Sequence, residues 1–414
     1  MKASPSAFAD ASADKFRRRL NDDKEKGGKD MAFTGKATYS AGTNLPELAE
    51  DVSDLIGIVS PYETPLLDAL GDPIREASST HHEWLEDELL ANKDAVNDNT
   101  FTDPDVDTSF DVDHGSRFQL GDQIQVEGSK ELMLVTGVNS NTLTVVRGYG
   151  GTTAENLADN QMINILGNAA LEGGERAASR FTNRARCGNY TQIFTASVEV
   201  SGTDLAAGVL GLADEMDFQK QERLRELIRD LENTVINGGQ PASSPQGSDS
   251  IRRTMKGIIS HLQTNVYKPG DSGFPSGNLL DEDKINYVLR KIWEGSSGNV
   301  DLIVVGGYQK RKINGFTEGA RSFPNSETTY RDMISVYESD FGVCRIITSR
   351  WIPKDAVLFL DSSRVSVLPL TGRSFHFKRL ASSGDYECGQ LIGEYTVEVR
   401  NEESGGIIRG LTAS

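Results

Sequence analysis

The longest amphipathic pattern in the chain runs from residue 212 to residue 236. Apolar side chains recur there at steps of three and four residues, which is typical of a helix with one buried face. Asn237-Gly238-Gly239 follows the pattern and suits a helix C-terminus. The predicted buried face is Leu212, Met216, Leu224, Leu227, Ile228, Leu231 and Val235, and the predicted exposed face is Asp217, Gln221, Glu222, Arg225, Arg229 and Glu232.

A different pattern occupies residues 110–167. Four runs rich in β-branched residues, at 123–127, 131–138, 142–147 and 162–166, are separated by short polar turns. Short strands between tight turns are typical of a small barrel or sandwich. The pattern predicts an inserted β-domain over residues 108–167.

Two extended segments of opposite charge flank this insert. Glu83 and Glu86 lie before it, and Arg180, Arg184 and Arg186 lie after it. The two segments could pair as a long hairpin, in which cross-strand ion pairs contribute about 0.2–1 kcal/mol each. The alternative, that these are unrelated solvated charges, is equally compatible with the pattern.

The remaining chain alternates helix and strand patterns. A helix is expected to begin at Asp281, with Ile285, Val288, Leu289, Ile292 and Trp293 on one side, and "VDLIVVGG" reads as a short buried strand. "GVCRIITS", "AVLFLD" and "RVSVLPL" predict further strands. In "LIGEYTVEVR" the apolar residues Leu391, Tyr395, Val397 and Val399 alternate with Glu394, Thr396 and Glu398, which predicts a half-buried strand.

Near the front of the chain, "DLIGIVSPYETPLLDALG" spans residues 54–71. Two short apolar clusters flank a polar turn, and Pro61 and Pro65 prevent one long helix from running through both clusters. The stretch therefore predicts a hinged piece that packs against a protein surface. Its candidate packing residues are Leu55, Ile58, Pro61, Tyr62, Pro65, Leu66 and Leu67.

Composition narrows the classes of function. The net charge of −18 and the pI of about 4.8 disfavour sequence-specific DNA binding, although residues 1–30 carry eight basic and six acidic side chains and are net basic. The three cysteines are scattered without a metal-binding or disulfide spacing. The apolar runs are far shorter than the roughly 20 residues that cross a bilayer, so no membrane span is expected.

Candidate chemistry is sparse. His81-His82-Glu83 lacks the spacing that places two imidazoles on one helix face. Asp103, Asp105, Asp107, Asp111 and Asp113 alternate with other residues, but the glycine and the terminal glutamate of a calcium loop are absent, so a solvated acidic linker is favoured. We find no nucleophile elbow or phosphate-binding loop. The expectation is no catalytic residue, no cofactor and no bound metal.

The stretch at 54–71, the long mid-chain helix, "LIVVGG", "SVYESDFGVCRIITSRWIPKDAVLFLD" and the closing "GEYTVEVRNEESGGIIRGL" resemble a family of major capsid proteins of tailed bacteriophages, with a Hong Kong 97-like shell fold of the α+β class. The resemblance implies an N-terminal arm (1–72), an extended loop (73–107 and 168–200) that carries the β-insert (108–167), and a spine helix with a linker (201–250). It further implies an axial domain (251–360) and C-terminal strands (361–414) that complete a peripheral domain with the spine helix.

The same resemblance implies the function. Copies of the chain would assemble into hexameric and pentameric capsomers of an icosahedral shell around double-stranded DNA, without sequence-specific DNA binding, cofactor or membrane. Assembly would take place in the host cytoplasm, with portal, scaffold and decoration proteins as further candidate partners. The alternatives are another virion protein, such as a tail tube or decoration protein, and a hydrolase that uses a carboxylate pair.

Overall fold

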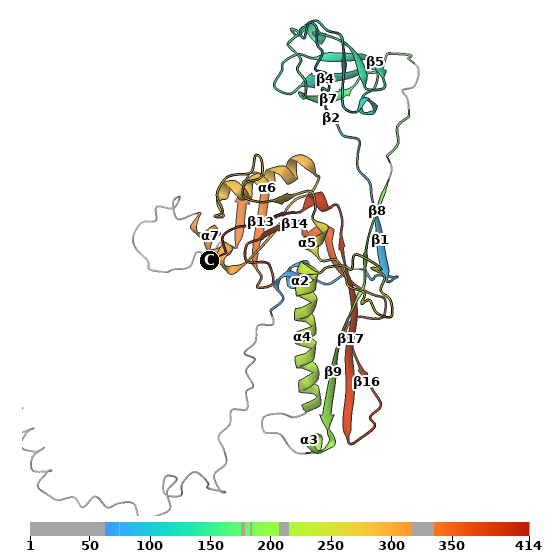
Figure 1. Ribbon diagram of the computed structural model, residues 1–414, viewed down its shortest axis with the longest axis vertical. Helices are drawn as coiled ribbons and strands as arrows, with labels where there is room; N and C mark the ends of the chain where they lie inside the picture. The colour runs from blue at the N-terminus through green and yellow to red at the C-terminus, as the bar shows by residue number, and fades with distance from the viewer. Residues whose placement is uncertain are drawn as a thin grey trace, which may run out of the picture. The chain divides into compact units, whose positions relative to one another are not determined.

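The described chain is mainly β-structure, with four sheets and few helices (Figure 1). This computed structural model describes residues 63–73, 75–174, 179–182, 184–206, 215–316 and 335–413. Leu55, Ile58, Pro61, Tyr62 and Leu212 lie outside the described residues. Among the described helices, none combines the length and the apolar character that a bilayer span requires.

Six strands form a closed barrel in the order β2-β7-β4-β5-β6-β3. The edge strands are joined by a bridge between Val96 and Val112 and by a hydrogen bond from the Asn97 amide to the Asp111 carbonyl (2.9 Å). Alternate side chains fill the interior, as in other small barrels. The strands are β2 (Lys93–Ala95), β3 (Ser109–Asp111), β4 (Asp122–Val126), β5 (Met133–Asn139), β6 (Thr142–Val146) and β7 (Met162–Asn168).

A buried ion pair ties the loops of this barrel together. The Arg147 guanidinium donates to both oxygens of Glu131, each at 2.8 Å, and to the carbonyls of Pro104 and Asp107. Burial alone would raise the pKa of Glu131, but the bonds from Arg147 and from two backbone amides outweigh burial and lower this pKa. The charges of the pair are therefore satisfied within the barrel itself.

The four predicted strands of the insert are all present, within two or three residues at each end. The expected limit at residue 108 leaves out one strand, because β2 pairs with β7 and closes the barrel. β2 and β3 each span three residues, which is too short for an alternating pattern to be visible in the sequence.

A second sheet joins β9 (Gln192–Ser201), β17 (Tyr386–Val399), β15 (Val365–Pro369) and β16 (His376–Arg379). The long helix α4 (Glu215–Asn237) runs alongside β9 and β17 (Figure 1). Phe375 and Phe377 lie against two glycines of β17: a Cβ atom at Gly389 would lie 2.0 Å from the Phe377 ring, and one at Gly393 would lie 2.4 Å from the Phe375 ring. The short helix α3 (Gly202–Ala206) follows β9.

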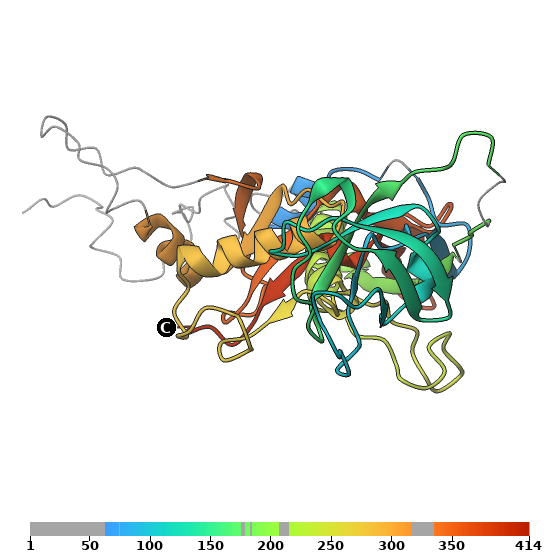
Figure 2. The same cartoon turned by 90° about the horizontal axis from the view of Figure 1, so that it is seen from above.

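The third sheet has the order β10-β18-β14-β11-β13-β12 and is covered on both faces. Helix α6 (Glu282–Gly295) packs with Ile303 and Val305 on one face (Figure 2). Leu302 and Val304 pack on the other face with the C-terminal part of α4. The strands are β10 (Val266–Tyr267), β11 (Leu302–Val305), β12 (Val336–Ser339), β13 (Gly342–Thr348), β14 (Val357–Leu360) and β18 (Gly406–Ile408), and the remaining helices here are α5 (Ile258–His261) and α7 (Gly307–Gly315).

Several details of this region were predicted. Asp281 caps α6, accepting a hydrogen bond from the Lys284 amide at 3.0 Å. Two expectations were wrong. Trp293 is 63% exposed, although its neighbour Ile292 is buried, and its ring lies beside Phe341 with the ring centroids 5.9 Å apart. β18, expected with the C-terminal strands of the second sheet, instead pairs with β14 and β10 in the third.

The closure of the barrel generates a prediction about an isolated fragment. A fragment of residues 92–169 contains all six strands and the Glu131–Arg147 pair, so it should be soluble and should unfold cooperatively, as followed by far-ultraviolet circular dichroism. A fragment of residues 108–168 lacks β2 and leaves β7 as an open edge, so it should be less stable. Equal stability of the two fragments would contradict the role given to β2.

Candidate functional site

The segments on either side of the barrel pair as an antiparallel ribbon. β1 (His81–Glu86) aligns with β8 (Ala185–Tyr190), so the hairpin alternative holds for these six residue pairs. The Arg186 guanidinium lies 3.7 Å from the Glu83 carboxylate, and both side chains are exposed, so the ion pair contributes little. Arg180 and Arg184 are exposed on the chain leading into β8. The ribbon must therefore be held by other contacts.

Glu86 is the first of these contacts. Its carboxylate accepts hydrogen bonds from the Trp84 indole (2.9 Å), from the Cys187 thiol (3.3 Å) and from the Asn401 amide (2.6 Å). Burial, and then the neighbouring Glu86, raise the pKa of the Cys187 thiol. One carboxylate thus connects both strands of the ribbon to the chain that follows β17.

Glu398 on β17 is the second contact, and it corrects the expectation of a half-buried strand. Its side chain is 1% exposed and is surrounded by Arg75 (3.0 Å), His82 (2.7 Å) and Arg400 (2.9 Å). Burial alone would raise the pKa of Glu398, but His82, Arg75 and Arg400 outweigh burial and lower this pKa. The predicted solvent face of β17 is covered by the base of the ribbon.

Glu394 lies four residues before Glu398 on the same face of β17, and its side chain is also buried. It accepts hydrogen bonds from the Thr191 hydroxyl and from Arg253, both at 2.6 Å, and the Arg373 guanidinium lies 2.7 Å away. Thr396, between the two glutamates, is also buried. The face predicted to be polar and exposed is polar and buried, because donors from three other segments cover it.

Helix α2 (Pro65–Leu70) docks onto the body through a third buried carboxylate, Glu232 of α4. The Glu232 side chain was expected on the exposed face of the long helix, but it is fully buried. It accepts hydrogen bonds from the Leu67 amide (3.2 Å) and the Ser349 hydroxyl (3.4 Å). Pro65 occupies the first turn of α2, where its missing N–H is not needed.

The expected packing role of the 65–71 cluster is visible in part. Leu66 is fully buried in the main core, and Leu67 is half-buried against it. The Trp351 indole donates to the Glu63 carbonyl at 3.2 Å, which fixes the start of α2. The role of the cluster in assembly stays a prediction.

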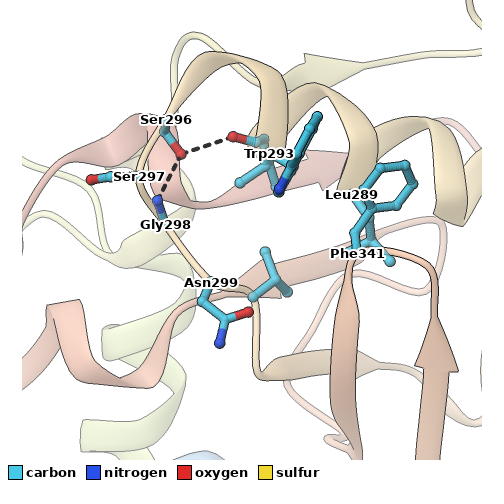
Figure 3. Close-up of a pocket in the computed structure, with 9 residues that line it drawn as sticks. Leu289, Trp293, Ser296, Ser297, Gly298, Asn299 and Phe341 are labelled. Atoms are coloured by element: carbon cyan, nitrogen blue, oxygen red, sulfur yellow. Dashed lines mark hydrogen bonds between the residues drawn. The ribbon is translucent and has the colours of Figure 1, made fainter.

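A pocket of about 340 Å³ at the end of α6 is lined by apolar and neutral polar side chains (Figure 3). Ser296 donates to the Ile292 carbonyl and accepts from the Gly298 amide, so its hydroxyl is engaged in ending the helix. None of the lining residues is acidic, basic or a histidine, so the lining holds no general acid or base that could activate the Ser296 or Ser297 hydroxyl. The lining residues are Leu289, Ile292, Trp293, Ser296, Ser297, Gly298, Asn299, Val300 and Phe341.

An acidic cluster around Asp94 and the two histidines of the His81-His82-Glu83 motif make contacts within the chain. Donor atoms of Asp94, Asp113 and His114 lie within 4.8 Å of one another. However, Asp94 already accepts from the His114 amide (2.8 Å) and from Arg117 (3.0 Å), which a cation there would have to displace. His81 stacks on Tyr190, and His82 binds Glu398.

The burial of Glu394 and Glu398 and the identity of their partners could not be predicted from the sequence. Arg75, Arg253 and Arg373 come from segments separated from Glu394 or Glu398 by tens to hundreds of residues, so no local spacing marks them. The sequence shows only that polar and charged residues alternate with apolar ones along β17. Such a pattern by itself predicts that the charged face of the strand is exposed to solvent.

The chain is similar to known capsid proteins. A family model described as SU10 major capsid protein matches residues 32–412. The major capsid protein of Escherichia phage Phieco32 is 23% identical over 287 residues, which cover 58% of this chain and 80% of that protein. Among solved structures, the capsid chain of a native GTA particle, computed with C5 symmetry, covers 92% of this chain and all of that chain, with a TM-score of 0.52 and 9% identity. The corresponding chain of an empty GTA particle also gives a TM-score of 0.52 at 9% identity, covering 91% of this chain and all of that chain.

The buried position of Glu398 generates a stability prediction. The change Glu398→Gln should lower the free energy of unfolding by roughly 3 kcal/mol, because it leaves Arg75, His82 and Arg400 without their anion, and breaking buried pairs costs about 3–5 kcal/mol. The matched control is Glu387→Gln on the same strand, since the Glu387–Arg379 pair is exposed and contributes about 0–1 kcal/mol. Urea unfolding of both variants provides the measurement.

The effect should also depend on pH. Because the pKa of Glu398 is lowered, its contribution is present above the ordinary glutamate pKa of 4.5 and is lost as the pH falls through the folded value. The difference between wild type and Glu398→Gln should therefore shrink in acid. A loss equal to that of the control at neutral pH would show that the buried pairs do not hold the ribbon.

Proposed function

Because the chain belongs to the SU10 major capsid protein family and is a major capsid protein of a tailed phage, we propose that its copies form hexameric and pentameric capsomers of an icosahedral shell around double-stranded DNA. The fold is Hong Kong 97-like, and the protein is a structural component of the virion rather than an enzyme. The alternatives of a tail protein, a decoration protein and a hydrolase are thereby set aside.

One observation supports the contact between copies most directly. The segments that run from the ribbon toward the barrel carry large apolar side chains that face solvent within the subunit. Leu89 is 89% exposed and Phe181 is 82% exposed. Exposed apolar sets of this kind mark protein interfaces. The other members of the set are Leu90 and Leu171 on these segments and Leu85 in strand β1 of the ribbon.

We define these five residues as the apolar arm set. The ribbon β1–β8, from which the arm segments extend, is anchored to the subunit by Glu86 and Glu398. The side chains of the apolar arm set themselves remain largely exposed. Burying apolar surface contributes about 25 cal/mol per Å², so covering these side chains on a neighbouring copy favours assembly. Repetition of the contact around a capsomer makes a modest interface sufficient.

The remaining expectations become parts of this proposal. Of the expected extended loop (73–107 and 168–200), the parts outside the barrel act as the loop, with Glu83, Arg180, Arg184 and Arg186 as charges that guide the contact. Glu86 instead anchors the loop to its own subunit. Leu55, Ile58, Pro61 and Tyr62 precede α2 and are proposed as arm contacts, while Pro65, Leu66 and Leu67 hold α2 to its own subunit.

The domain division proposed from the sequence is kept with two amendments. The barrel insertion begins near residue 92, and β18 is assigned with the axial domain at 251–360 rather than with the peripheral strands. The barrel is the proposed place for a decoration protein. Portal and scaffold proteins, and assembly in the host cytoplasm, complete the proposal. The net charge of −18 agrees with a shell that encloses DNA without sequence-specific binding.

The apolar arm set generates an assembly prediction. The double change Leu89→Ser and Phe181→Ser should prevent particle formation, because it removes apolar surface that only a neighbouring copy covers. Sedimentation and negative-stain electron microscopy of the full chain measure particle yield. Circular dichroism and thermal unfolding of the unassembled chain should stay unchanged, since both side chains are exposed in the subunit.

The matched control is Val106→Ser, which changes another exposed apolar residue, in a loop of the barrel. This control should assemble like the wild type. Particle formation by the double variant at the wild-type concentration would refute the role of the apolar arm set.

A further inference from the structure

Glu232 combines full burial with a set of contacts that reach outside its own helix. It lies on α4, and it binds the first turn of α2 through the Leu67 amide and the chain after β13 through Ser349. α2 is the first helix of the described chain and lies within the expected N-terminal arm of residues 1–72. Loss of the Glu232 contacts would loosen the docking of this helix on the subunit body.

The charges around Glu232 do not include a matching cation. Asp68 on α2 repels it, and Glu63 before α2 is paired with Arg350 at 3.4 Å. Arg345 of β13 points its guanidinium to the Ala69 carbonyl at 3.5 Å, and on α4 itself Arg229 binds Asp230. Within the described ranges, no basic side chain forms an ion pair with Glu232 at 4 Å or less.

This environment favours the protonated carboxyl. Burial raises the pKa of Glu232 to about 7, while the amides of Leu67 and Leu66 and the Ser349 hydroxyl act in the opposite direction and Asp68 adds to the rise. Undocking of α2 would admit water to Glu232 and return its pKa toward the ordinary value of 4.5. The docked state therefore binds the proton more tightly than the undocked state.

We propose that Glu232 is a proton-operated latch for the N-terminal arm: a proton taken from solvent onto its carboxyl strengthens the docking of α2, and loss of that proton weakens it. The sign follows from linkage. A group whose pKa is raised in the docked state stabilises docking fully below the undocked pKa, and this stabilisation is lost as the pH rises through the docked pKa. Docking is thus strongest in acid and weakens between about pH 4.5 and pH 7.

The latch is a property of the single subunit and does not depend on shell assembly. In an assembled particle the docking of α2 in each copy would therefore change with pH. The packing on either side of the third sheet is apolar and would stay the same over this pH range.

Hydrogen exchange of the unassembled full chain tests the latch. The amides of residues 64–71, corrected for intrinsic exchange rates, should lose roughly a hundredfold in protection between pH 5 and pH 8, because the pKa of Glu232 is about 7 in the docked state and 4.5 when exposed to water. The amides of α6 should keep constant protection and serve as the internal reference. In Glu232→Gln the protection of residues 64–71 should be independent of pH.

The matched control is Glu226→Gln, six residues earlier on α4, where the carboxylate pairs with Arg223 and remains partly exposed. It should keep the wild-type pH dependence. Protection that does not change with pH in the wild type, or a pH dependence that persists in Glu232→Gln or vanishes in Glu226→Gln, would overturn the proposal.

Two further variants separate a latch from a merely structural residue. Asp68→Asn removes the repelling charge and should move the midpoint of the transition to lower pH. Ser349→Ala removes a donor to the carboxylate and should move it to higher pH. Shifts in the same direction, or no shifts, would also count against the latch.

Discussion

The architecture depends on three carboxylates that are buried where the sequence pattern would expose them. Glu394 and Glu398 lie on β17, and Glu232 lies on α4. Glu394 and Glu398 are paired with cationic side chains from distant parts of the chain, because an ionised group cannot be buried without such partners. Glu232 accepts hydrogen bonds from the Leu67 amide and the Ser349 hydroxyl but has no cationic partner among the described residues. These contacts fix where the ribbon β1–β8, the start of β9 and the helix α2 attach. The apolar cores hold the sheets together, and the buried acids hold the attachments.

This division of labour suits a protein that must assemble with its own copies. The attachments are rigid at their base, because Glu86 and Glu398 connect the ribbon to the chain around the end of β17. The apolar side chains farther along the arms have no comparable anchoring in the subunit. The barrel is self-contained through its own core and its Glu131–Arg147 pair. The folded subunit thus presents exposed apolar side chains to its neighbours without changing its own core.

The sequence predicts those elements that are long enough to show a repeating pattern of apolar and polar residues. The strands β4 to β7, the helices α4 and α6, and the buried strand β11 were all expected close to their observed places. β2 and β3 were not, because three residues carry no period, and their pairing follows only from closure of the barrel. Glu232, Glu394 and Glu398 were assigned to solvent because local patterns do not include partners such as Arg75 or Leu67. Of the candidate residues, Leu66 packs in the core, Glu83 pairs with Arg186, and Glu86 anchors the ribbon to the chain after β17. Glu232 and Glu398, which hold α2 and the ribbon, were not among the candidates.

We infer that the arms of one copy are covered by a neighbouring copy in a closed shell. Cryo-electron microscopy of particles assembled from the full chain can locate these side chains. We expect a closed shell in which Leu89 and Phe181 of each copy are buried against the next copy, while Glu398 keeps its contacts with Arg75 and His82 inside the subunit. A closed shell in which Leu89 and Phe181 face solvent would contradict it.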